Sequence, residues 1–136
     1  MRLVVDTSVL VAGFRSPRGL SARTLVACRR LEHRMVVTAT LIFEYEAVIC
    51  RVEHLRAAGA SIEDAGKFLD AVCGFADWVT PTWLWRPQLR DPDDEMVLEA
   101  AVSGGAEIIT FNVRDFETAD RFGVRVMTPA ELWKET

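Results

Sequence analysis

Acidic side chains stand at four places where predicted strands end or predicted helices begin. Asp6 ends a short apolar run, Asp94 opens an Ala-rich helix, Asp115 follows the fourth predicted strand, and Glu44 lies one turn into the helix after the second. Carboxylates gathered at one sheet edge repel one another and raise one another's pKa. A hard divalent cation removes that cost, and such oxygen ligands suit Mg²⁺ or Mn²⁺. The acids therefore predict a divalent metal site.

Each acid also has an ordinary structural explanation. Asp6 can cap the helix that follows it, Asp94 favours a helix N-terminus electrostatically, and Glu44 can be a surface residue. Two other glutamates compete for the same role. Glu46 is two residues from Glu44, so only one of the two can face a site on their helix. Glu99 is expected on another face of its own helix.

Short apolar runs alternate with helical patterns along the whole chain. The runs predict strands at residues 2–6, 34–39, 77–80, 107–111 and 124–127. Strands that are apolar throughout are typical of a parallel sheet covered on both faces. The sequence therefore predicts an α/β fold, a three-layer α/β/α sandwich around a parallel sheet of about five strands. In such sheets the ligand crevice lies beyond the carboxyl ends of the strands, where these acids fall.

The segments between the strands carry apolar residues at helical spacing. They predict helices at 9–14, 20–31, 41–52, from 61 to about 75, from about 94 to 102, near 116–121, and a final turn from 128. Residues 61–64 (SIED) fit a capping box, and Gly104-Gly105 closes the Ala-rich helix. None of these helices begins with a Gly-rich phosphate-binding turn, so a nucleotide cofactor has no support.

Length and composition limit the class of protein. The chain has 136 residues, which predicts one domain over residues 1–136. It is 50% hydrophobic and 26% charged, which excludes intrinsic disorder. No apolar run approaches the roughly 20 residues that span a bilayer, and Asp6 falls where a signal peptide would still be apolar. We therefore expect a soluble, cytoplasmic protein with no membrane association.

Cysteine and histidine offer no second metal site. Cys28, Cys50 and Cys73 include no C-x-x-C pair, so we expect small core residues rather than thiolate ligands or disulfides. His33 and His54 are far apart in the sequence and flanked by charges, which predicts solvated surface histidines.

Charge is distributed unevenly along the chain. The net charge is −4, yet residues 1–34 carry seven Arg against two acids, or +5. Fourteen of the sixteen bases are Arg, the side chain that pairs bidentately with phosphate. The basic N-terminal third permits nucleic-acid binding, although a solvated helix face explains it equally well. Arg15 and Arg18, in the loop after the first motif, are candidates for phosphate contacts, with a solvated loop as the alternative.

Trp78, Trp83 and Trp85 form an aromatic cluster after the third predicted strand. They could stack on bases of RNA. Core packing, or a surface for a dimer or another partner, is the stronger expectation, because aromatic residues are enriched at interfaces.

Four motifs occur in order along nearly the whole chain. They are residues 4–10 (VVDTSVL), the Glu44 helix, residues 90–94 (RDPDD) with Ala100-Ala101, and residues 104–106 (GGA) followed by Ile109-Thr110, with 128–131 (TPAE) near the end. The arrangement resembles a PIN domain, specifically the bacterial toxin-like group of toxin–antitoxin systems.

The resemblance implies a metal-dependent endoribonuclease, the toxin of a type II toxin–antitoxin pair. Asp6, Glu44 and Asp94 match the three principal acidic positions of the family, with Asp6 as the central ligand of one or two Mg²⁺ or Mn²⁺ ions. The implied partners are an RNA substrate, a cognate antitoxin protein and a second copy of the chain in a homodimer.

The fourth acidic position departs from the family pattern. The family often has an Asp two residues after Thr110, where this chain has Asn112, and Asp115 follows three residues later. We favour Asp115 as the fourth ligand because a full negative charge helps to hold a hard cation, with Asn112 as the alternative. The hydroxyls of Thr7, Ser8 and Thr110 are candidates to hydrogen-bond the ligand carboxylates, or are caps and strand residues.

Two other functions are compatible with the sequence. A phosphohydrolase could use Asp6 as a nucleophile, but that class usually has a second Asp two residues on, where this chain has Ser8. An inactive PIN-like module could bind RNA without cleaving it, because the fourth ligand is altered.

Overall fold

The sheet has the parallel architecture that the apolar strands predict. The computed structural model describes residues 1–81 and 88–135. Its five strands lie in the order β3-β2-β1-β4-β5, and every neighbouring pair is parallel. Their bounds are β1 (Arg2–Val5), β2 (Arg34–Val37), β3 (Asp77–Trp78), β4 (Glu107–Ile109) and β5 (Val126–Met127). The predicted fold class is confirmed.

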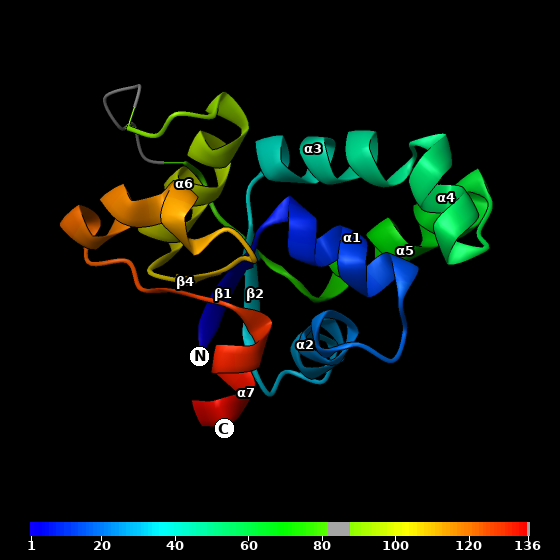
Figure 1. Cartoon of the computed structure of the whole chain (residues 1–136), viewed down its shortest axis with the longest axis horizontal. Coiled ribbons are helices and arrows are strands. Elements are labelled where there is room, and N and C mark those ends of the chain that lie inside the picture. Colours follow the sequence, from blue (N-terminus) through cyan, green and yellow to red (C-terminus); the bar gives the residue numbers. More distant parts are fainter. Residues whose placement is uncertain (82–87, 136) are drawn as a thin grey trace.

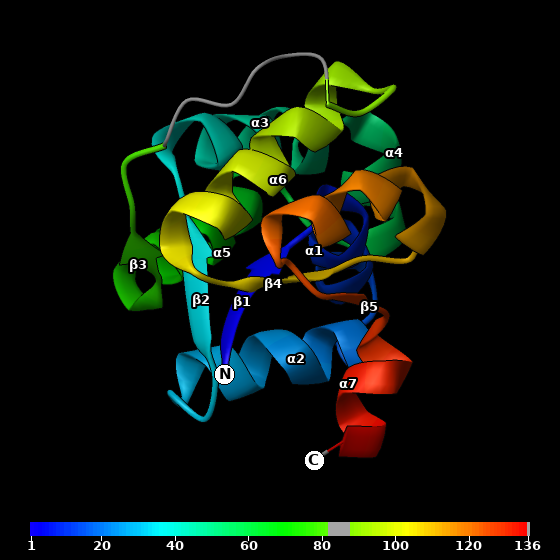
Figure 2. The same cartoon turned by 90° about the vertical axis from the view of Figure 1, so that its left-hand side faces the viewer.

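Helices cover both faces of the sheet. They are α1 (Thr7–Arg15), α2 (Leu20–Arg29), α3 (Ala39–Ile49), α4 (Val52–Ala58), α5 (Ile62–Phe75), α6 (Pro92–Gly104), the 3₁₀ helix η1 (Val113–Phe122) and α7 (Pro129–Glu135). In Figure 1, α6 and η1 lie on one side of β1 and β2, while α1, α2 and α5 lie on the other. Figure 2 shows α6 and η1 in front of the strands, with α3 crossing above them. This is the three-layer arrangement.

The central strand explains why the sheet is apolar on both faces. Leu3, Val4 and Val5 of β1 are consecutive residues, and all three are completely buried. Successive side chains of a strand point to opposite faces, so β1 is covered on each side. Asp6 follows immediately, and its backbone N–H continues the ladder by donating to the carbonyl of Ile109 at 2.9 Å. The first acid is thereby fixed at the edge where the strands end.

Helix α6 has a well-defined start and end. The Asp91 carboxylate caps it by accepting from the Asp93 N–H, and Pro92 occupies the first turn, where no N–H is needed. Gly105 ends the helix in the left-handed conformation with φ 59°. Asp94 is therefore held in the first turn of a rigid helix.

The structure differs from the sequence-based expectations at a helix boundary and in the burial of side chains. The helix predicted over 41–52 ends at Ile49, and a separate helix, α4, begins at Val52, although no Gly or Pro marks the break. His33 was expected on the surface but is only 8% exposed, because it packs edge-on against the Trp133 ring at 6.2 Å. Of the three cysteines expected in the core, Cys28 is buried, whereas Cys50 and Cys73 are only partly buried.

Trp78 is half exposed, and its indole N–H donates to the carbonyl of Cys73 at 3.0 Å. Trp83 and Trp85 lie outside the described residues. In the part of the chain that the structure describes, no helix is long and apolar enough to cross a membrane.

Candidate metal centre

Asp6 occupies the junction between β1 and α1 and is only 6% exposed. Its Oδ2 accepts hydrogen bonds from the hydroxyls of Ser8 at 3.0 Å and Thr110 at 2.6 Å. Burial raises the pKa of this carboxyl, while the bonds from Thr110, Ser8 and the Thr7 backbone oppose that rise. Asp6 is the residue before α1, but its side chain makes no capping hydrogen bond to that helix. The hydroxyls of Ser8 and Thr110 therefore hold the orientation of the carboxylate.

Tyr45 of α3 contacts the same junction, a role that the sequence did not suggest. The side chain is completely buried, and its hydroxyl donates to the carbonyl of Val5. This bond ties α3 to the end of β1, one residue before Asp6. Because Glu44 is the neighbour of Tyr45, the same bond also fixes the position of Glu44 along the edge.

Asp94 is the most perturbed of the candidate ligands. It is half-buried in the first turn of α6, and its pKa is raised to about 7. Burial is the largest cause, followed by the negative charges of Asp6, Asp91, Asp115 and Asp93. Repulsion from Asp6 and Asp115 places all three carboxylates in one electrostatic site, although β1, α6 and η1 are far apart in the sequence.

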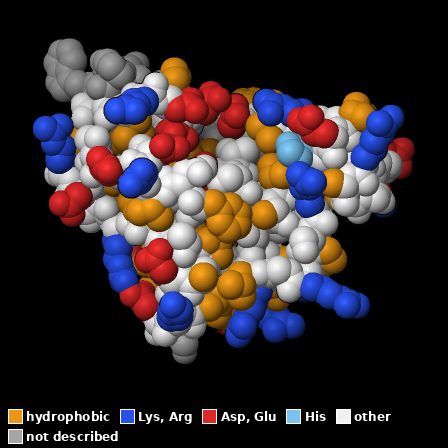
Figure 3. All heavy atoms as spheres, viewed as in Figure 1, with side chains coloured by type: hydrophobic (Ala, Val, Ile, Leu, Met, Phe, Trp, Pro, Cys, Tyr) orange, Lys and Arg blue, Asp and Glu red, His pale blue; other side chains and the backbone are white. Residues whose placement is uncertain are grey.

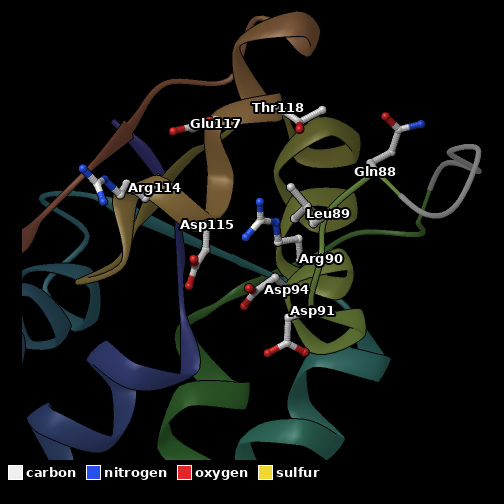
Figure 4. A pocket seen from close by; sticks show the side chains of 9 residues that line it. All are labelled: Gln88, Leu89, Arg90, Asp91, Asp94, Arg114, Asp115, Glu117 and Thr118. Atoms are coloured by element: carbon white, nitrogen blue, oxygen red, sulfur yellow. The ribbon is translucent and has the colours of Figure 1, made fainter.

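Asp115 faces Asp94 across a cleft. The cleft has a volume of about 630 Å³ and lies between the start of α6, with the loop before it, and η1. In Figure 4 the carboxylates of Asp94 and Asp115 point toward one another, whereas Asp91 points away. Asn112 is exposed and is not among the residues that line this cleft. Of the two candidates for the fourth position, the structure brings Asp115 to the other acids.

Glu44 lies beside a neighbouring group of acids. Burial raises its pKa first, then the negative charges of Asp93 and Asp91, while Arg51 lowers it. Asp91 also acts on Asp94, so it lies between the two groups. Figure 3 shows acidic side chains gathered around a hollow where α6 and α3 begin. Glu44 therefore borders the site from the α3 side and does not stand at its centre.

The competing glutamates lie apart from this group. Glu46 is exposed on α3, and Glu99 is 7% exposed on α6. The structure also separates the predicted phosphate-binding arginines from the acids. Arg15 ends α1, about 12 Å along the helix from Thr7. Neither Arg15 nor Arg18 lines the cleft, whereas Arg90 and Arg114 are among the described residues that do.

The donor chemistry of the site fits Mg²⁺ or Mn²⁺. Carboxylate oxygens are the ligands that these hard cations prefer, and a cation would favour the charged form of Asp94, which burial and then the neighbouring negative charges disfavour. Within residues 1–81 and 88–135, no three His, Cys, Asp or Glu side chains are already gathered closely enough to hold a metal ion. Mg²⁺ commonly keeps several waters and binds through one or two carboxylates, which Asp6 and Asp94 can supply. The metal stays a prediction.

The chain matches a family model described as the PIN domain over residues 2–114. The match includes Asp6, Glu44 and Asp94 and spans most of the 136 residues. The chain therefore belongs to the PIN-domain family.

Solved structures share the fold at low sequence identity. One is a crystal structure of VapBC2 from Rickettsia felis bound to a DNA fragment from its promoter. The matched chain has 12% sequence identity and a TM-score of 0.64, and the match covers 93% of this chain and 97% of that chain. VapBC-1 from nontypeable Haemophilus influenzae is 16% identical with a TM-score of 0.62, covering 96% and 99%. No curated protein sequence matches this chain significantly. These likenesses establish the architecture.

Proposed function

We propose that this PIN-domain protein is an endoribonuclease that depends on Mg²⁺ or Mn²⁺. One observation carries the proposal: Asp6, Asp94 and Asp115 come from three separate elements to one end of the sheet, where burial, followed by the negative charges of the surrounding acids, raises the pKa of Asp94 to about 7. Such an arrangement lowers the free energy of unfolding unless a bound cation offsets the negative charge. A bound divalent cation supplies an activated water and neutralises charge on the phosphate that is attacked.

The residues of the chain have separate tasks in this proposal. Asp6 and Asp94 hold the cation, and Asp115 adds a third charge from the opposite wall of the cleft. Ser8 and Thr110 fix the orientation of the Asp6 carboxylate through their hydrogen bonds to Oδ2. Hydrogen bonds of this kind keep a ligand in place when the cation is absent.

We further propose that the protein is the toxin of a toxin–antitoxin pair in the cytoplasm. The support is the resemblance of its motifs to the toxin-like PIN group, together with two solved neighbours that are VapBC structures. A cognate antitoxin protein and a homodimer belong to this proposal. Expression of the chain alone should arrest growth, and co-expression of a small adjacent reading frame should restore it. Asp6→Asn should remove the arrest without the second protein.

The nuclease activity is tested with end-labelled RNA. Purified wild-type protein should produce internal cuts with Mg²⁺ or Mn²⁺ and none with EDTA, and Asp6→Asn should be inactive. Asp70→Asn, the same change at an exposed site on α5, is the matched control and should cleave normally. RNA binding without cleavage under every metal condition would favour the inactive RNA-binding module instead.

A further inference from the structure

The cleft beside Asp94 contains an arginine that forms no ion pair with any acid in the described part of the chain. Arg90 and Arg114 both line the cleft, but only the Arg90 side chain extends across it toward Asp115 in Figure 4, while Arg114 points away. The guanidinium of Arg90 forms no ion pair or hydrogen bond with the described residues. An exposed arginine that lines the same cleft as Asp94 and Asp115, and forms no ion pair with a described acid, is available to bind an anion that enters the cleft.

The backbone on the N-terminal side of Arg90 is fixed by a buried carboxylate. Glu95 is 2% exposed, and its Oε1 accepts from the backbone N–H groups of Gln88 at 2.5 Å and Leu89 at 2.8 Å. Leu89 is itself buried in the core at 7% exposure. The Oε2 atom of Glu95 is also buried and has no hydrogen-bond partner in the described structure. A carboxylate desolvated to this degree is costly, and its bonds restrict the loop before Arg90.

The C-terminal side of Arg90 is fixed as well. The next residue, Asp91, caps α6, and Pro92 locks the first helical position. Arg90 is therefore an exposed side chain on a backbone restrained from both directions. A group presented on a restrained backbone loses less conformational freedom when it binds a ligand.

We propose that Arg90 binds a phosphate of the RNA strand in the cleft beside Asp94 and Asp115, and that Glu95 positions it. The proposal rests on the nuclease function above. RNA that approaches Asp91, Asp94 and Asp115 is repelled by them, and a guanidinium offsets this repulsion and pairs bidentately with phosphate oxygens. Arg90 thus takes the role that the sequence suggested for Arg15 and Arg18.

Binding and cleavage should be measured separately. The first assay follows fluorescence anisotropy of a short labelled single-stranded RNA in EDTA, with wild type, Arg90→Gln, Arg90→Lys and the control Arg56→Gln. Arg90→Gln should weaken binding about tenfold, and Arg90→Lys should recover part of the loss, since lysine keeps the charge but not the fork. Arg56→Gln removes the same charge at an exposed site on α4 and should bind as wild type does.

Salt dependence identifies a direct phosphate contact. Each phosphate neutralised on a single strand contributes about 0.7 to the slope of log affinity against log salt concentration. The slope should therefore be smaller by about 0.7 in Arg90→Gln than in wild type. In the cleavage assay with Mg²⁺, Arg90→Gln should raise KM more than it lowers kcat, because the contact acts on binding.

The role of Glu95 is tested by a double-mutant cycle. Glu95→Ala should weaken RNA binding, and Glu95→Gln should restore it because the amide oxygen can still accept from the two N–H groups. In the Arg90→Gln background, Glu95→Ala should cause little further loss of affinity, since its effect passes through Arg90. A merely structural role would give the same loss in both backgrounds.

The outcomes separate this inference from the proposed function. If the wild type cleaves RNA but Arg90→Gln binds it with unchanged affinity and salt slope, the role of Arg90 is wrong and the nuclease stands. If no metal supports cleavage but binding still depends on Arg90, the nuclease proposal is wrong and the phosphate contact stands.

Discussion

The acids at the two edges of the sheet, where the strands begin and where they end, have pKa values shifted in opposite directions. Where the strands begin, the Asp77 carboxylate of β3 accepts from Arg34 of β2 and, at 2.8 Å, from Arg2 of β1, and these bonds lower its pKa. Where the strands end, the pKa values of Asp6 and Asp94 are raised, chiefly by burial. Among the described arginines and lysines, none forms an ion pair with either of these two acids.

The ion pairs of Asp77 stabilise the fold, whereas the buried charges of Asp6 and Asp94 destabilise it. The Asp77 cluster joins three strands and also includes the carbonyl of Gly104 at the end of α6, which accepts from Arg2 at 2.7 Å. Its charges are compensated within the chain. Asp6 and Asp94 at the other edge form no ion pair with a described arginine or lysine. In the function that we propose, one edge is structural and a cation compensates the acids at the other.

The largest expected difference between the edges is in RNA cleavage. Asp6→Asn and Asp94→Asn should each lower the rate at least about a hundredfold, because even residues that merely support metal ligands contribute about 10- to 100-fold. Asp77→Asn should stay within about twofold of wild type when assayed well below its melting temperature. Circular dichroism should show folded protein in all three variants. Equal losses at both edges would remove the distinction.

Asp115 and Asn112 should differ in their contribution to cleavage. Asp115→Ala should lower cleavage about tenfold or more, since it removes a charge that faces Asp94 across the cleft, whereas Asn112→Ala should change it less than about twofold. Asn112→Asp should not strengthen Mn²⁺ binding, because Asn112 is outside the cleft. The measurements are single-turnover cleavage rates and Mn²⁺ titrations. Tighter Mn²⁺ binding in Asn112→Asp would assign the fourth position to that residue.

Mg²⁺ should raise the melting temperature through the acids at one edge of the sheet and not through Asp77 at the other. Mg²⁺ at a hundred times its dissociation constant should stabilise the protein by about 2.7 kcal/mol, or roughly 10 °C in Tm. Asp6→Asn should lose most of this gain, and Asp77→Asn should keep it in full, although it melts lower at every metal concentration. Thermal scans with and without Mg²⁺ provide the test. A Tm that does not change when millimolar Mg²⁺ is added would contradict a cation site.

The smallest expected effects have opposite signs in the metal-free protein. The lowered pKa of Asp77 adds stability above its ordinary value of 3.8, and this stability is lost as the pH falls through the folded-state pKa. The raised pKa of Asp94 means that stability is lost as the pH rises from 3.8 through about 7. At about pH 8, Asp77→Asn should therefore destabilise the protein and Asp94→Asn should stabilise it, each by roughly 1 kcal/mol after solvent screening. Urea unfolding with EDTA measures both.

Much of the fold could be predicted because local pattern and tertiary context agree. The apolar run before Asp6 is buried on both faces, so its composition alone indicates a central parallel strand. The break between α3 and α4 could not be predicted, because residues 49–52 contain no Gly or Pro to mark it. Asp6 was identifiable for a simpler reason: an acid directly after a buried strand must lie at its carboxyl edge. Glu44 and Asp94 lie inside helices, and the resemblance to the PIN family was needed to single them out.

Pairings between distant residues could not be predicted from the sequence. Nothing near Asp77 indicates that Arg2 and Arg34 meet it, because strand order decides that contact. The same holds for Glu95, whose bonds to the loop before α6 depend on how that loop turns. Arg15 and Arg18 were candidates for phosphate binding on charge and proximity in sequence, but α1 carries them away from the acids.

The most direct test follows the carboxyl carbons of Asp94 and Asp77 by NMR through a pH titration, with and without Mg²⁺. Without metal, Asp94 should titrate at about 7 and Asp77 below 3.8. Saturating Mg²⁺ should move the pKa of Asp94 down by more than about one unit, because the cation favours its charged form, and should leave Asp77 unchanged. An Asp94 that titrates near 3.8 in both conditions would contradict a cation site at this edge of the sheet.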